Sequence, residues 1–234
     1  MYPKKISPNP LVSSTVEIRF KSEKDSSGVL TSLVPLISFK LGKIESTAIP
    51  RELRLKNPEL KYYPEYIFSN EDYSLSCNEN FISFENITEY KLWGNYSTFL
   101  GEILDSVFNS GIIQEIERIG VRFQSEFTGR EFKYIFNNTP ELNIKEFEED
   151  FLKYTTRIKS EEFNIVLRFK KGIDDNLLEE SDNASHKIDL DVFLNKNLKE
   201  NEVINKINSA HSVLKKLFFG LLNEDFVKTL NPEY

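Results

Sequence analysis

The stretch Val16-Glu17-Ile18-Arg19-Phe20 and its counterpart Ile119-Gly120-Val121-Arg122-Phe123 decide the expected fold. In each stretch apolar residues occupy every second position, and this period of two is typical of a strand with one buried face. Both stretches end in the same Arg-Phe pair, and similar series of elements follow them along the chain. The pair therefore indicates an internal repeat, and the alternative is that two alternating strands resemble each other by chance.

Hydrophobic periodicity and turn residues outline the elements that follow each strand. After the first strand, we predict a helix over 29–37, an irregular connection over 43–61, strands at 62–68, 73–77 and 81–87, and a helix over 96–108. After the second, we predict a short helix over 144–151, a hairpin of 154–159 and 163–169, an acidic loop over 172–185, a strand at 187–193, a long helix over 204–221 and a short one over 223–230. The expected fold is α+β, with two tandem β-α-β-β-β-α repeats, residues 1–112 and 113–234, in one compact body. Each repeat is an antiparallel sheet with its long helices packed on one face.

Composition excludes several classes of protein. The 234 residues carry a net charge of −7, which disfavours nucleic acid as a partner. The single cysteine, Cys77, rules out an internal disulfide and a multi-cysteine zinc site, and we expect it to be an inert strand thiol. The N-terminus has no apolar core of a signal peptide, and no stretch approaches the ~18 apolar residues of a membrane span. We expect a cytoplasmic protein.

Three segments resemble the motifs of a known family. Asn9-Pro10-Leu11-Val12 leading into residues 16–20 is similar to its opening strand, and residues 96–104 with 116–123 resemble its middle motif. Residues 187–193, Ala210-His211 and Leu217-Phe218 resemble its C-terminal motif, although members often carry Asn where this chain has Gln124-Ser125. The family is an uncharacterised one, sporadically distributed among bacteria and archaea. The resemblance implies an accessory gene from a defence or toxin-related neighbourhood, and it brings no reaction or catalytic residue with it.

The alternating strands expose an unusually charged face. If their apolar residues meet the helices, the opposite face carries the candidate ligand-binding residues Glu17, Arg19, Arg122, Gln124, Arg168, Asp189 and Asp191. Arginine offers a planar fork of donors to carboxylate or phosphate, so such a face could bind a small anionic ligand. The alternative is a set of cross-strand Arg–Asp and Arg–Glu pairs facing water.

Catalytic signatures are not found in the sequence. It contains no glycine-rich phosphate loop and none of the common hydrolase or zinc motifs. Of the two histidines, His186 falls in the acidic loop, where we expect it to be solvated, and His211 falls on an apolar helix stripe, where we expect it to pack. We assign no catalytic residue, metal ligand or cofactor.

We expect a non-enzymatic binding protein, an accessory component of a prokaryotic defence system that binds a small anionic ligand or a protein encoded in the same operon. One alternative is a metal-dependent hydrolase that uses Asp189 and Asp191, whose i, i+2 spacing puts both carboxylates on one strand face. Another alternative is a purely structural protein-interaction subunit. A homo-oligomer is compatible with each of these hypotheses.

Overall fold

The computed structural model describes residues 2–47, 49–137, 152–172 and 185–234. By internal contacts the chain divides into two compact units, each made of separate segments. Unit 1 consists of Met1–Ser13, Arg122–Val192 and Ala210–Tyr234, and unit 2 of Ser14–Val121 and Phe193–Ser209. We describe each unit by itself.

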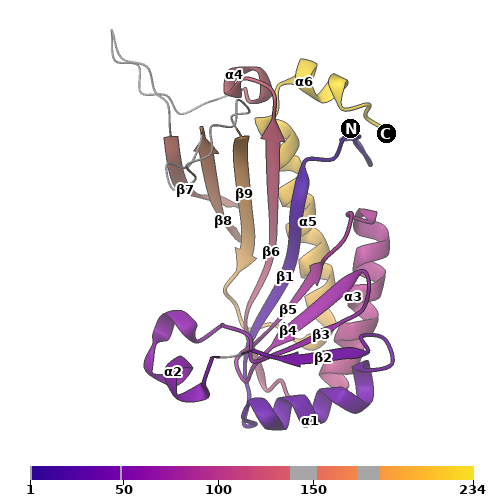
Figure 1. Cartoon of the computed structure of the whole chain (residues 1–234), viewed down its shortest axis with the longest axis vertical. Coiled ribbons are helices and arrows are strands. Elements are labelled where there is room, and N and C mark those ends of the chain that lie inside the picture. Colours follow the sequence, from indigo (N-terminus) through magenta and orange to yellow (C-terminus); the bar gives the residue numbers. More distant parts are fainter. Residues whose placement is uncertain (1, 48, 138–151, 173–184) are drawn as a thin grey trace. The chain divides into compact units, whose positions relative to one another are not determined.

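The protein is α+β, as the sequence predicts, with helices and one nine-stranded antiparallel sheet (Figure 1). The strands are β1 (Leu11–Lys21), β2 (Lys43–Ser46), β3 (Tyr66–Ser69), β4 (Tyr73–Cys77), β5 (Phe81–Asn86), β6 (Glu115–Thr128), β7 (Leu152–Ser160), β8 (Phe163–Lys171) and β9 (Ser185–Leu194). Their order in the sheet is β2-β3-β4-β5-β1-β6-β9-β8-β7. The helices are α1 (Ser26–Ile37), α2 (Arg51–Lys56), η1 (Pro58–Leu60), α3 (Leu92–Asn109), α4 (Phe132–Ile135), α5 (Glu200–Leu221) and α6 (Glu224–Thr229).

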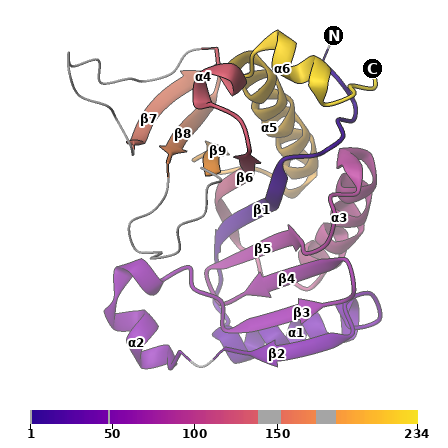
Figure 2. The ribbon, with the colours of Figure 1, turned by 45° about the horizontal axis from the view of Figure 1, so that its top comes forward.

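Unit 2 is built around β4, β5 and the helices α1 and α3 (Figure 2). Asp25 caps α1 by accepting a hydrogen bond from the Gly28 amide at 2.9 Å, and α3 buries a stripe of Tyr96, Leu100, Ile103, Leu104 and Val107. The Tyr96 hydroxyl donates to the Phe84 carbonyl at 2.7 Å, which fixes α3 on β5. These contacts bury the apolar face of the strands and leave the polar face outward.

Unit 1 has an aromatic core. Phe127 on β6 contacts Phe136 and Phe226 edge-on, at centroid distances of 5.3 and 5.8 Å, and Phe169 on β8 meets Phe136 at 5.2 Å. Edge-to-face packing of this kind is favourable for aromatic rings beyond the area it buries. These rings lie on the inward face of β6 and β8, so the alternate residues of the same strands point the other way.

Most predicted elements are present, and three expectations need correction. The irregular connection predicted over 43–61 was wrong, because it contains β2, α2 and η1. The third strand of the first half begins at Tyr66 and not at Tyr62. His186 is not a solvated loop residue: it lies in β9 with only 4% of its surface exposed. The short helix predicted over 144–151 and most of the acidic loop lie outside the described residues.

Helices in the described part of the chain are too short or too polar to cross a membrane.

Candidate functional site

Alternation along β6, β8 and β9 places three charged residues of unit 1 on one strand face. Val121 and Phe123 are buried on either side of Arg122, and Ile188 and Leu190 are buried on either side of Asp189. Arg168 lies between the buried residues Leu167 and Phe169 in the same way. Because neighbours in a strand point to opposite faces, the three polar side chains turn away from the core.

Asp189 joins the two arginines. Arg122 donates from Nε to Oδ1 of Asp189 at 2.8 Å and from an Nη to Oδ2 at 2.6 Å, which is a bidentate pair. Arg168 donates from Nη1 to the same Oδ2 at 3.1 Å. The Asp189 side chain is 14% exposed, whereas Arg122 and Arg168 are 46% and 38% exposed. One carboxylate therefore orients two guanidinium groups that both still reach solvent.

Gln124 and Asp191, the other candidates in unit 1, are half-buried on the same face. Gln124 lies one strand repeat beyond Arg122, before Glu126, which pairs with Lys187 at 3.3 Å. Asp191 follows Asp189 by two residues on β9. The structure thus brings five of the seven candidates onto one face of one unit.

The same face continues onto β8 and β7 with basic residues. Thr155 of β7 is the partner of Arg168, and Lys153 is the partner of Lys170, so these four side chains share a face. The basic residues on this unit 1 strand face are Arg122, Lys153, Arg157, Lys159, Arg168, Lys170 and Lys187, and the acidic ones are Glu126, Asp189 and Asp191. Basic side chains outnumber acidic ones here, although the whole chain has a net charge of −7.

Glu17 and Arg19, the remaining two candidates, belong to unit 2, where they form a separate group with Arg118. Arg19 donates to Glu17 at 2.7 Å and lies 3.9 Å from the centre of the Tyr62 ring. Arg118 also pairs with Glu17, and its guanidinium lies 4.5 Å from the centre of the Phe193 ring. Both cations therefore rest on aromatic faces and share one carboxylate, which makes this group more enclosed than the arginines of unit 1.

Sequence reasoning missed Arg118, because the predicted strand began at Ile119 whereas β6 begins at Glu115. The signal was there: positions 118, 120 and 122 share a face by the same alternation. Gly120 leaves room for this arrangement, because a Cβ at that position would meet Nη1 of Arg118 at 2.8 Å.

Both histidines are held neutral. Burial, with a smaller effect of Lys215, lowers the pKa of His211 to about 3, and the ring packs 5.7 Å from that of Phe123. Burial also lowers the pKa of His186, whose Nε2 lies 3.0 Å from the carbonyl oxygen of Arg130 and is therefore the protonated nitrogen. The pKa of His211 therefore lies far below neutrality, where general acid–base catalysis is most efficient, and burial shifts the pKa of His186 in the same direction.

Two further features bear on the chemistry. Burial raises the pKa of the fully buried Cys77 to about 12, so this thiol is inert, as expected. Among the described residues, no three or more His, Cys, Asp or Glu side chains gather as metal ligands.

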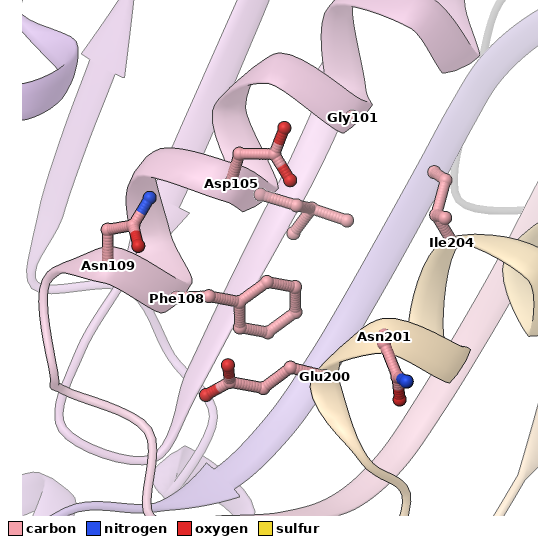
Figure 3. A pocket seen from close by; sticks show the side chains of 8 residues that line it. Gly101, Asp105, Phe108, Asn109, Glu200, Asn201 and Ile204 are labelled. Carbon is pink, nitrogen blue, oxygen red and sulfur yellow. The ribbon is translucent and has the colours of Figure 1, made fainter.

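A pocket of about 470 Å³ lies in unit 2 between α3 and the first turns of α5 (Figure 3). Leu104, Phe108 and Ile204 form its apolar part. Asp105 and Glu200 also line it, and their negative charge opposes the binding of an anion. The pocket and the unit 1 strand face therefore differ in the ligands they suit.

Comparison of the chain with protein-family models, with curated proteins and with solved structures finds no match.

Proposed function

We propose that the protein is a non-enzymatic binding protein that takes a small anionic molecule on the unit 1 strand face, with Arg122 and Arg168 as its main contacts. The observation that carries the proposal is the shared carboxylate of Asp189, which accepts hydrogen bonds from both guanidiniums while more than a third of each remains exposed. A planar guanidinium suits phosphate and carboxylate because it presents parallel N–H donors.

Asp189 acts as a positioning residue in this proposal. A guanidinium on a long side chain loses conformational freedom when it binds a ligand, and prior fixing by Asp189 reduces that loss. The two arginines outweigh the carboxylate of Asp189 in charge, and Lys170 adds to the positive potential nearby. Since the site is open to solvent, screening by salt should weaken binding.

Calorimetry of the full chain against inorganic phosphate, a nucleotide panel and a panel of organic acids tests the proposal. Arg122→Ala and Arg168→Ala should each weaken binding of any ligand found by about tenfold, the loss expected for one charged hydrogen bond. Arg19→Ala is the matched control, because it removes an arginine of similar side-chain exposure, 30%, from unit 2. Equal affinity of the wild type, Arg122→Ala and Arg168→Ala for every ligand found would rule the proposal out.

A metal-dependent hydrolase using Asp189 and Asp191 gains no support from the geometry. The Asp189 carboxylate already accepts hydrogen bonds from two cations, and a metal ion would have to displace them. Retention of a stoichiometric divalent ion by protein purified without chelator, and its loss in Asp191→Asn, would revive this alternative.

We also propose that the two halves, 1–112 and 113–234, descend from one duplicated unit. The strand order supports this, because the first strand of each half lies beside the last: β1 is next to β5, and β6 is next to β9. The strands β4 and β3, and likewise β8 and β7, follow outward in matching order. An experimental structure in which the β1, β3–β5 and α3 set fails to superpose on the β6–β9 and α5 set would refute it.

The family resemblance extends the proposal to an accessory role in a prokaryotic defence or toxin-related system, with a partner encoded nearby. Co-expression with the neighbouring gene products, followed by purification of a stoichiometric complex, tests this role. Failure of every neighbour to bind would count against it.

A further inference from the structure

Strand β7 is an edge strand of unusual length and regularity. All nine of its residues pair with β8, from Leu152↔Lys171 to Ser160↔Phe163, without a bulge. It ends the strand order, so in the described part of the chain it has a strand neighbour on one side only (Figure 1). In an antiparallel ladder alternate residues direct their N–H and C=O groups to opposite sides, so half of these groups point to the open edge.

Among the residues that the structure describes, most of the protections usual for such an edge are missing. Natural edge strands are kept from pairing by shortness, proline, bulges or charge, and β7 contains no proline and no glycine. The strand at the other end of the order, β2, has only four residues. Of these features, β7 has only charge, which comes from Lys153, Arg157 and Lys159.

The two faces of β7 differ in chemistry. Lys153, Thr155, Arg157 and Lys159 are exposed on the unit 1 strand face. Tyr154 and Ile158 lie on the opposite face and are 39% and 38% exposed. The edge thus presents basic side chains on one face and apolar side chains on the other, in strict alternation with its backbone groups.

We propose that β7 is a docking site for an extended segment of a partner protein in which acidic residues alternate with apolar ones. Such a segment would extend the sheet by backbone hydrogen bonds, as in other cases of strand addition. Its acidic side chains would meet Lys153, Arg157 and Lys159, and its apolar side chains would cover Tyr154 and Ile158.

Charge excludes a second copy of β7 as the favoured occupant. Antiparallel pairing of two β7 strands about Thr156 would place Lys153 of each chain opposite Lys159 of the other. Like charges directly opposite each other destabilise a ladder. An acidic segment would not meet this repulsion. Its negative charge would also compensate the positive charges of Lys153 and Lys170, which are direct partners in the β7–β8 register.

The experiment uses the full chain and a synthetic nine-residue peptide in which glutamate alternates with valine. The charge-reversal variant Lys153→Glu/Arg157→Glu/Lys159→Glu should bind the peptide at least about tenfold more weakly than the wild type. The matched control is Lys56→Glu/Lys196→Glu/Lys199→Glu, which makes the same change in charge at exposed positions of unit 2 and should bind like the wild type.

Two N-methylated peptides test the strand geometry. One carries methyl groups on the odd-numbered amides and the other on the even-numbered amides, so only one of them loses the N–H groups that face β7. We expect one methylated peptide to lose binding and the other to keep it. Tyr154→Ser/Ile158→Ser should weaken the peptide several-fold, and circular dichroism checks that each variant is folded.

Several outcomes would overturn the proposal. These are equal binding of both methylated peptides, no effect of charge reversal, no peptide binding, and dimerisation through β7 in place of peptide binding. Single-stranded DNA could also bind the wild type more tightly than the peptide does, with an affinity that Tyr154→Ser/Ile158→Ser leaves unchanged. That result would show that the strand face binds a polyanion and would overturn the proposal. The inference goes beyond the proposed function, and the two can fail separately, because the comparison of the two methylated peptides tests backbone pairing at β7 and involves neither Arg122 nor Arg168.

Discussion

Replacing Arg54 with methionine should destabilise unit 2 by about 3 kcal/mol. Arg54 lies on α2 with its side chain only 1% exposed, between the carboxylates of Glu65 and Glu79. One Nη also lies 3.3 Å from the hydroxyl oxygen of Ser26 at the start of α1. This arginine therefore ties α2 to the rest of unit 2.

The magnitude follows from burial. Removing one member of a buried ion pair costs about 3 to 5 kcal/mol, because it leaves the other charge without compensation. The Glu65 and Glu79 side chains keep 19% and 12% of their surface exposed, which places the cost at the lower end. The buried Nε of Arg54 has no hydrogen-bond partner in the described part of the chain. Methionine removes this unsatisfied group, which also favours the lower end of the range.

The dependence on pH provides a second check. Burial alone raises the pKa of Glu79, but hydrogen bonds from Ser26 and Arg54 and the charge of Arg54 bring it below the ordinary value of 4.5. A lowered folded-state pKa adds stability that is fully present above pH 4.5. This stability is lost as the pH falls from 4.5 through the folded-state pKa. The difference between the wild type and Arg54→Met should therefore shrink in acid.

Urea unfolding followed by the fluorescence of Trp93 measures the effect. Trp93 is the only tryptophan, and it lies in unit 2, where its Nε1 donates to Asn208 at 2.8 Å. Lys56→Met, an exposed position two residues along, is the control and should change the free energy of unfolding by less than about 0.5 kcal/mol. The reasoning is refuted if Arg54→Met costs no more than Lys56→Met at neutral pH.

Three more predictions concern single residues. Gly120→Ala should lower the free energy of unfolding by about 1 kcal/mol, because the new Cβ displaces Arg118 from Glu17 and from the Phe193 ring. Replacing glycine in a strand ordinarily raises the free energy of unfolding, and such an increase here would contradict the contact between position 120 and Arg118. Because burial lowers the pKa of His211 to about 3, the contribution of this residue to stability is complete above pH 6.5 and declines below it. Acidification from pH 7 to 5 should therefore cost the wild type about 1 to 2 kcal/mol more than it costs His211→Phe. Thermal unfolding across this range checks it, and parallel curves for the two proteins would disprove it. The Cys77 thiol should resist a thiol reagent in native buffer and react fully in urea; rapid reaction of the native protein would contradict its burial.

The elements that the sequence predicts well are those with a regular buried face. The alternation of residues 16–20 corresponds to β1, where Val16, Ile18 and Phe20 are buried, and the apolar stripe over 96–108 lies within α3. Two of the missed elements, β2 and α2, lack such a face. Strand β2 is exposed along its whole length, and the buried residue of α2 is Arg54, a charged side chain. His186 could have been found by extending the inward positions 188, 190 and 192 back by one repeat.

The candidate site could be predicted at the level of the strand face but not of the contacts. Period two identified Arg122, Arg168 and Asp189 as outward residues, and the structure pairs them through one carboxylate. Which arginine meets which acid depends on the order and register of strands far apart in the sequence, and periodicity carries no information on either. That Glu17 and Arg19 belong to unit 2 could not be predicted for the same reason, because the units are defined by tertiary contacts.

The segmented make-up of the two units limits how the protein can be dissected. Their boundaries fall after Ser13, Val121, Val192 and Ser209, which lie inside β1, β6, β9 and α5. No single break in the backbone can separate the two units, because the segments of each unit alternate along the chain with those of the other. Functions assigned to one unit must therefore be separated by point substitution, because every contiguous fragment that contains one whole unit also carries residues of the other.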